Sequence, residues 1–253
     1  MTDETKGTKR KSNTTPEMSF WDHLEEFRSR LIKSILFMAG GFCAAYFFIP
    51  YLQDFLIDSF FRVESAPLAF LKPTEGFIVR LKLALFIGLI LTTPAVFYQF
   101  WQFVSPGLLQ KEKKFIIPIV VTSSLSFLTG IVISYFSLPY ATRFFLSFGT
   151  GNIENIWSFG SYVDFVIRIM LAFGIVFELP LIIYFLVRLG IVTPQFLRNK
   201  RRHAIIICLV VAAVITPPDI FTMIMLSIPL ILLYEISIIV STVTYKKHYR
   251  ENP

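Results

Sequence analysis

Long runs without charged side chains alternate with short charged segments along most of the chain. Four runs are long and apolar: residues 34–50, 83–110, 115–142 and 169–187, the last interrupted only by Glu178. A helix needs about 20 apolar residues to cross a hydrocarbon core of about 30 Å. A strand of a transmembrane barrel would instead alternate with period two over about 10 residues. The pattern therefore predicts four membrane-spanning helices.

Two shorter apolar runs follow, at residues 204–218 and 220–234, separated only by Asp219. Together they are too long for one helix, and Pro217 and Pro218 interrupt them. We therefore predict a tight helical hairpin, which brings the total to six spans. Fifteen residues rise only about 22 Å, so both arms of the hairpin are predicted to be shorter than the hydrocarbon core.

The connections between the apolar runs carry helical patterns of their own. Residues 19–31 have apolar side chains at spacings of four, three and four, which predicts an amphipathic helix at the membrane surface that leads into the first span. Residues 51–75 have an apolar helical stripe followed by two prolines, which predicts a helix lying on the membrane as an external cap. The second external connection, residues 139–160, contains Trp157, a residue type suited to the membrane interface.

Composition and charge agree with a membrane protein and indicate its orientation. The chain is 55% apolar and 16% charged, with a mean hydropathy of +0.65, whereas soluble domains are about one quarter charged. Of its 24 lysines and arginines, eighteen lie on one side of the predicted spans and three on the other, while Arg80, Lys82 and Arg168 lie near or within spans. Basic loops stay cytoplasmic, so both termini are predicted to be cytoplasmic. The net charge of +7 then reflects topology rather than nucleic-acid binding.

One membrane domain is predicted over residues 19–245. Residues 1–18 are polar and lack the apolar segment of a secretory signal, so we predict a disordered cytoplasmic tail. Residues 246–253 form a second, shorter cytoplasmic tail. The sequence contains no phosphate-binding loop, zinc-protease motif or nucleophile elbow. We therefore expect neither an enzyme nor a cofactor.

Several carboxylates require an explanation. Glu178 lies in the middle of an apolar run, where an unpaired charge costs several kcal/mol; a functional role and a neutral packing hydrogen bond are both open. Glu26 and Glu112 lie on the predicted cytoplasmic side, where spacing alone favours solvated charges, and Glu26 can pair with Arg30 one helical turn away. Two carboxylates at a membrane surface would, alternatively, bind two guanidinium groups in bidentate geometry.

Four motifs in order carry a family resemblance. They are HLEEFRSRL at 23–31, YQFWQFVSPGL at 98–108 followed by KEKK at 111–114, FGIVFELP at 173–180 and TPPD at 216–219. Together they resemble the TatC family, the multispanning core of the twin-arginine protein translocase. The resemblance covers residues 19 to 245 and implies an all-α protein of the bacterial cytoplasmic membrane. Its six spans would form a concave bundle with an external cap.

The resemblance also implies a function and site residues. TatC proteins are receptors for folded precursors whose signal peptides carry an Arg-Arg pair, and export is driven by the proton gradient. Glu26 and Glu112 match the acidic positions of the signal-binding patch, Arg28 matches a further position of it, and Phe103 lies in the same loop as Glu112. Glu178 matches the family's intramembrane acidic residue, which faces a concave pocket.

The partners implied by the resemblance are the single-span proteins TatA and TatB, together with further copies of the chain in a receptor complex. The partner helices are expected beside the last two spans, at Thr216, Pro217, Asp219, Thr222 and Met223. Met223 stands where some relatives carry a polar amide, and Thr222 is a candidate substitute for it. The short final spans add the hypothesis that a locally thinned bilayer assists translocation.

Two other functions are weighed against this interpretation. A secondary transporter would use Glu178 and Arg168 as a midplane ion or solute site, inside broken helices around a closed cavity. The lack of an internal repeat and the four ordered motifs count against it. An intramembrane hydrolase would need a nucleophile and a base, and no such pair is recognisable in the sequence.

Overall fold

The computed structural model describes residues 20–61, 68–104, 116–148, 156–215 and 219–251, which are almost all helical. The helices are α1 (Phe20–Tyr46), α2 (Ile49–Phe61), α3 (Glu75–Val104), α4 (Ile116–Leu146), α5 (Phe159–Phe177), α6 (Leu179–Arg188), α7 (Pro194–Asn199), α8 (Arg201–Ile215) and α9 (Ile220–Glu251). Two short strands, β1 (Leu68–Ala69) and β2 (Trp157–Ser158), pair in parallel.

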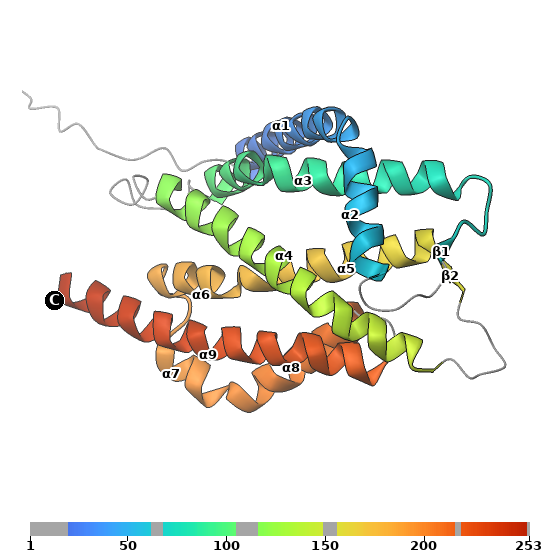
Figure 1. Cartoon of the computed structure of the whole chain (residues 1–253). Helices are drawn as coiled ribbons and strands as arrows, with labels where there is room; N and C mark the ends of the chain where they lie inside the picture. Colours follow the sequence, from blue (N-terminus) through green and yellow to red (C-terminus); the bar gives the residue numbers. More distant parts are fainter. Residues whose placement is uncertain (1–19, 62–67, 105–115, 149–155, 216–218, 252–253) are drawn as a thin grey trace, which may run out of the picture.

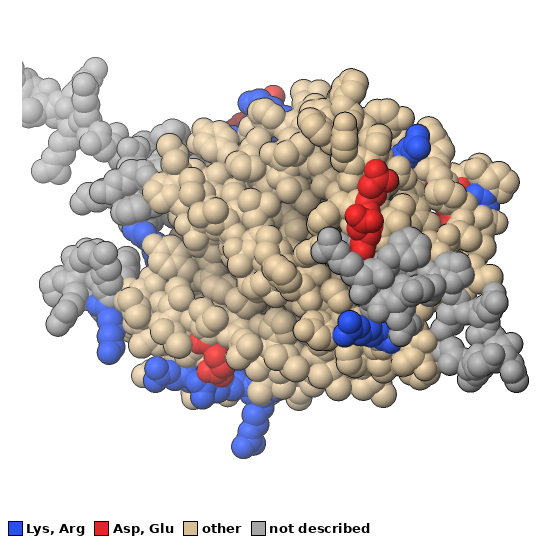
Figure 2. Space-filling model, in the orientation of Figure 1, with Lys and Arg blue, Asp and Glu red and all other residues tan. Residues whose placement is uncertain are grey.

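The long helices run between two ends of the molecule (Figure 1). One end holds α7 and the last turns of α9, and we call it the basic end because Arg198, Arg201 and Lys246 lie there. The opposite end holds α2 and both strands, and we call it the cap end. Figure 2 shows a broad uncharged area between the basic end and α2, acidic side chains over the face where α2 crosses it, and most basic side chains nearer the edges. An uncharged area of this kind is expected where a helix bundle faces lipid.

Among the described residues, four segments are long and apolar enough to cross a membrane: α3, α4, α5 together with α6, and residues 220–246 of α9. Helices α1 and α2 meet at a bend of 73° and would count together as a fifth. α8 has 15 residues, fewer than a full span requires. The all-α, multi-pass architecture is confirmed, and the count of six spans stays a prediction.

Two helices begin earlier than the apolar runs predict. α3 begins eight residues before residue 83, and α5 begins ten residues before residue 169. These extra turns contain Lys82 and Asp164, whose side chains bind each other across the two helices at 2.6 Å. Lys82, which ends the apolar run of α3, is neutralised by this pair, whereas Arg168, which ends the apolar run of α5, is an exposed residue within the helix. Both helices therefore continue past a charge that ends an apolar run.

The amphipathic helix predicted over residues 19–31 leads into the first span as part of α1, which continues from Phe20 into the first apolar run without a proline to interrupt it. The second arm of the hairpin differs from the prediction, because α9 has 32 residues and reaches Glu251. Only α8 keeps the predicted short length.

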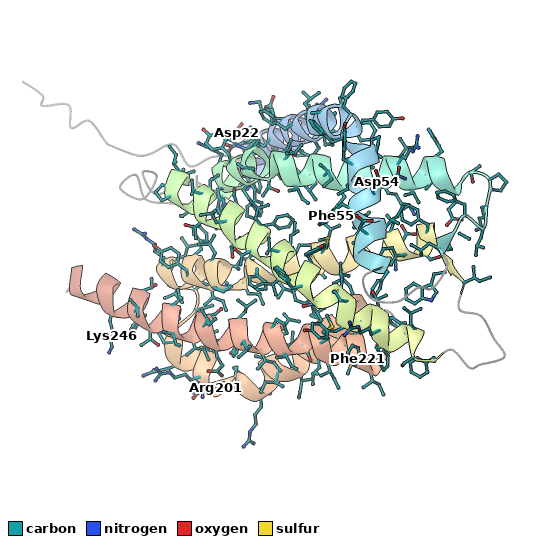
Figure 3. The ribbon with its side chains drawn as sticks, viewed as in Figure 1. Asp22, Asp54, Phe55, Arg201, Phe221 and Lys246 are labelled. Carbon is teal, nitrogen blue, oxygen red and sulfur yellow. The ribbon has the colours of Figure 1, made fainter. Side chains whose placement is uncertain are left out.

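The cap end is built from the two connections that the sequence predicts to be external. The helix predicted after residue 51 is confirmed as α2, and its place on the external membrane surface stays a prediction. Phe55 of α2 stacks on Tyr135 of α4 with ring centroids 5.3 Å apart (Figure 3). At the same end, Phe221 of α9 stacks on Phe144 of α4 at 4.3 Å (Figure 3). The pairing of β1 with β2 joins the two connections, so the cap end is a packed layer across the helices.

Close helix contacts depend on glycine at two places. A Cβ atom at Gly41 of α1 would lie 2.6 Å from the carbonyl oxygen of Gly88 on α3, and a Cβ atom at Gly130 of α4 would lie 2.6 Å from the carbonyl oxygen of Phe173 on α5. Small residues let helix backbones approach closely in membranes. The contact between α1 and α3 sets the position of the first candidate site.

Candidate functional site

The packing of α1 against α3 brings charged and polar side chains together near the start of α1. The Glu26 Oε1 atom accepts hydrogen bonds from Arg30 Nε at 2.8 Å and Arg30 Nη2 at 2.6 Å. Arg30 Nη1 also donates to Gln99 Oε1 of α3 at 3.4 Å. Arg30 is therefore held between the two helices, and Glu26 has the i, i+4 pairing that its spacing predicted.

The second carboxylate oxygen of Glu26 is available for a further partner. Oε2 is buried and has no hydrogen-bond partner among the described residues. A carboxylate oxygen can accept two hydrogen bonds, and an unfilled buried acceptor is costly. This oxygen is therefore a place where an incoming N–H donor would be stabilised.

Aromatic rings lie beside this carboxylate. Phe103, near the end of α3, stacks on the His23 ring at 4.4 Å and meets the Phe27 ring edge-on at 5.3 Å. We call Glu26, Arg30, His23, Phe27 and Phe103 the α1–α3 cluster. Its α1 members lie three and four residues apart, a spacing that puts them on one helix face.

The other residues of the expected signal-binding patch lie apart from this cluster or outside the described residues. Arg28 is exposed. Glu112 lies between residues 105 and 115, outside the described residues. The sequence pattern gave His23 no role, although its i, i+3 and i, i+4 relation to Glu26 and Phe27 was a usable signal.

A second candidate site is an apolar cavity of about 340 Å³ at the junction of α5 and α6. Its walls include Val96, Phe97 and Phe100 of α3, Leu171 and Ile175 of α5, and Ile182 of α6. Glu178 lies at this junction, is 7% exposed, and has a buried Oε1 atom without a hydrogen-bond partner among the described residues. The cavity thus offers an apolar surface with one unsatisfied carboxyl oxygen.

Local sequence explains why the helix is interrupted at this position. Pro180 lies in the first turn of α6 and has no N–H to donate. Glu178 is the last residue before α6, and its carbonyl oxygen accepts from the Leu181 N–H at 3.0 Å. The Phe177 carbonyl oxygen accepts from Ser126 Oγ of α4 at 2.6 Å. A neighbouring hydroxyl group that satisfies a freed carbonyl is one way in which an interrupted helix is tolerated within a membrane span.

The expected partner-contact residues lie where α9 begins. The Thr222 amide donates to Asp219 Oδ1 at 2.7 Å, and the Thr222 hydroxyl donates to Asp219 Oδ2. Thr222 is 1% exposed, and Met223 packs against the main core. Asp219 and Thr222 therefore cap α9, with Thr222 turned inward. Thr216 and Pro217 lie outside the described residues.

Two polar arrangements have no counterpart in the sequence pattern. The buried Glu75 carboxylate accepts from the amides of Leu71 at 2.7 Å, Lys72 at 3.1 Å and Gly160 at 2.6 Å, and from the Ser158 hydroxyl. The second arrangement is the Lys82–Asp164 ion pair. The contacts that join α3 to the start of α5 are between residues 82 to 85 positions apart in the sequence. Spacing along the chain therefore gives no indication of these contacts.

The described residues form neither a metal centre nor a paired Glu178–Arg168 site. No group of three or more His, Cys, Asp or Glu side chains in the described ranges is arranged to hold a metal ion. Arg168 is exposed on α5, whereas Glu178 is buried ten residues later, or about 15 Å along a helix. The structure does not bring the two residues of the transporter interpretation together.

The chain is similar to known proteins over most of its length. Residues 22–229 match the family described as Sec-independent protein translocase protein (TatC). Similar relatives of that name come from Desulforapulum autotrophicum, 44% identical and covering 90% of this chain and 86% of the relative, and from Aquifex aeolicus, 37% identical and covering 91% and 97%. The crystal structure of a twin arginine translocase receptor, TatC, superposes with a TM-score of 0.78 at 37% identity, covering 88% of this chain and 99% of that one.

Proposed function

The chain belongs to the TatC family of Sec-independent protein translocase components, and from this membership we propose that it is the receptor subunit for Arg-Arg signal peptides. As a TatC protein it is a multi-pass membrane component of a protein transporter, not a member of an enzyme family. In the proposed function, the signal peptide of a folded precursor binds at the basic end, which faces the cytoplasm.

The open Oε2 atom of Glu26 is the observation that supports this proposal. A signal guanidinium group can donate to Oε2 while Oε1 stays bonded to Arg30. The rings of His23 and Phe103 beside it offer a surface on which a planar guanidinium stacks and an ammonium does not. Glu112 is proposed to accept the second arginine. Such a site prefers arginine to lysine at both signal positions.

Site-specific photocrosslinking in native membranes tests this proposal. A precursor with an Arg-Arg signal is compared with the same precursor carrying Lys-Lys, on the unsubstituted chain and on the Glu26→Gln, Glu112→Gln double variant. We expect the crosslink to fall at least about tenfold in either case, the size of a lost charge-assisted hydrogen bond. Glu25→Gln is the matched control, because Glu25 is the exposed neighbour on α1.

Each other outcome has a definite meaning. An Arg-Arg crosslink that survives the double substitution keeps the receptor function and moves the binding site away from these carboxylates. A crosslink that fails to form even with the unsubstituted chain contradicts the receptor function and returns the transporter interpretation to consideration.

Glu178 and the start of α9 belong to the later steps of the proposed function. The apolar cavity beside Glu178 suits the apolar segment of an inserted signal or the helix of a partner protein. TatA and TatB are the proposed partners, with contacts near Thr216, Pro217, Asp219, Thr222 and Met223, and the proton gradient is the proposed energy source. Co-purification of tagged TatA and TatB with the chain from native membranes tests the assembly.

A further inference from the structure

One face of α5 and α6 has a regular spacing that extends beyond the cavity. Positions alternately three and four residues apart lie on one face of a helix. Along this face, Ile175 is 64% exposed and Ile182 is 42% exposed. We call this face the α5–α6 stripe, and its members are Ser161, Asp164, Arg168, Leu171, Ile175, Glu178 and Ile182. The last four of them line the cavity beside Glu178.

Arg168 is the unusual member of the stripe. It is exposed and lies within the apolar span formed by residues 159–188. It is nine residues from the start of α5, or about 14 Å along the helix. In the described part of the chain, Arg168 takes part in none of the ion pairs. A guanidinium group at this depth is costly unless a counter-charge meets it.

The nearest carboxylate in sequence does not supply that counter-charge. Asp164 lies one turn before Arg168, the usual spacing of a helical ion pair. Both of its oxygens instead bind Lys82 Nζ of α3, at 2.6 and 2.9 Å. Because Lys82 of α3 neutralises Asp164, the positive charge of Arg168 on the stripe is left without a counter-charge from either residue.

We propose that the α5–α6 stripe is the docking face for a transmembrane helix that carries a carboxylate, and that Arg168 pairs with this carboxylate. The proposal rests on the proposed function, because a translocase subunit receives helices from other proteins. Charge complementarity selects the occupant, since an acidic side chain in the half of the bilayer nearer the cap end meets the positive charge of Arg168. The apolar wall of Leu171, Ile175 and Ile182 packs against the rest of the same helix.

A phospholipid headgroup is the competing occupant, because a long arginine side chain can extend toward the membrane interface. The stripe favours a helix for two reasons. Arg168 is in register with the cavity rather than isolated on a lipid-facing surface, and the open Oε1 of Glu178 lies on the same line. A headgroup accounts for the arginine alone, whereas a docked helix accounts for both polar positions and the apolar wall between them.

The test uses the full chain in phosphatidylcholine vesicles and model transmembrane peptides of about 20 leucine and alanine residues. One peptide carries a single Glu in its outer third, and the other carries Gln at that position. Binding is measured by energy transfer to a dye on the chain. We expect the Glu peptide to bind about tenfold more tightly, the size of one polar contact between helices in a membrane.

Three variants assign this preference to Arg168. Arg168→Gln is expected to abolish it, and Arg168→Lys is expected to retain most of it because the charge remains. Arg80→Gln is the control, because Arg80 is exposed on α3 and lies off the stripe. Equal thermal unfolding midpoints of the variants establish that the fold is intact. A preference that persists in Arg168→Gln overturns the proposal, as does equal binding of both peptides to the unsubstituted chain.

Two further measurements separate the remaining outcomes. If native mass spectrometry shows phosphatidylglycerol retained by the chain and lost in Arg168→Gln, without any preference between the peptides, the occupant is a lipid and the proposal is overturned. The peptide assay contains no signal sequence, so its result is independent of the Arg-Arg crosslink. A peptide preference without a signal crosslink contradicts the receptor function alone, and a crosslink without a preference contradicts the docking face alone.

Discussion

Glu75 is a single residue whose carboxylate connects the segment before α3 with the segment that leads into α5. Its oxygens accept from Leu71 and Lys72 before α3 and from Ser158 and Gly160 at the start of α5. We expect Glu75→Gln to loosen the cap end, because the new amide group places N–H donors against other donors. Proteinase added on the cap side of membrane vesicles should cut the external connections severalfold faster in this variant.

The matched control for this prediction is Asp58→Asn. Asp58 is an exposed acidic residue of α2 at the same end of the molecule, so its substitution removes a charge without opening the Glu75 contacts. Equal cleavage of Glu75→Gln and Asp58→Asn would contradict a role of Glu75 in holding the cap end together.

At the residue scale, whether a polar side chain's role can be predicted from the sequence depends on how far along the chain its hydrogen-bond or ion-pair partner lies. Glu178 stands out because it is a charge within an apolar run, and the Glu26–Arg30 pair follows from helical spacing. Glu75 gives no such signal, because its partner Gly160 is 85 positions away. Asp164 is hidden for the same reason, since Lys82 lies on a different helix. Contacts within one helix can be predicted from spacing, and contacts between helices need the fold.

The contact between α1 and α3 is a property of the two elements and can be tested with adjacent glycines. A Cβ atom at Gly41 would meet Gly88 at 2.6 Å, whereas one at Gly40 would meet nothing within 4 Å. We expect Gly41→Ala to destabilise the protein by about 1–3 kcal/mol through overpacking. Gly40→Ala should be neutral or slightly stabilising, because alanine favours a helix.

Thermal unfolding in detergent measures the difference between these two variants. The signal crosslink provides a second measurement, because separating α1 from α3 also separates Glu26 from Phe103. Equal unfolding midpoints for Gly41→Ala and Gly40→Ala would show that the close approach of the helices contributes no stability.

The elements themselves were predictable where apolar runs define them and less so at their ends. The apolar runs indicated α3, α4 and the span formed by α5 and α6, because the hydrocarbon core requires such runs. The start of α3 was misplaced because Lys82 ends the apolar run but is neutralised by Asp164 of α5, and the start of α5 was misplaced because Arg168 ends the apolar run although the helix includes it. The strands β1 and β2 have two residues each, too few for any period to be visible.

At the scale of the whole molecule, three features are arranged along the direction in which the spans run. The α1–α3 cluster lies toward the basic end, the cavity beside Glu178 lies along the spans, and the Glu75 contacts hold the cap end. A signal peptide that binds at the first would meet the second as its apolar segment inserts. This order agrees with a receptor loaded from the basic end, and the stripe containing Arg168 continues from the cavity toward the cap end.

The length of α8 gives a last prediction that concerns the molecule and the bilayer together. Its 15 residues rise about 22 Å, and Arg201 at its start pairs with Glu235 of α9 at 2.9 Å, which fixes α8 along its neighbour. A helix this short draws the bilayer surfaces together.

Inserting four leucines between Val210 and Val211 adds about 6 Å and removes the mismatch. If local thinning assists translocation, export should fall severalfold while the signal crosslink remains. The same four residues placed after Lys246, beyond the apolar part of α9, are the control, and normal export by the lengthened variant would rule out the thinning hypothesis.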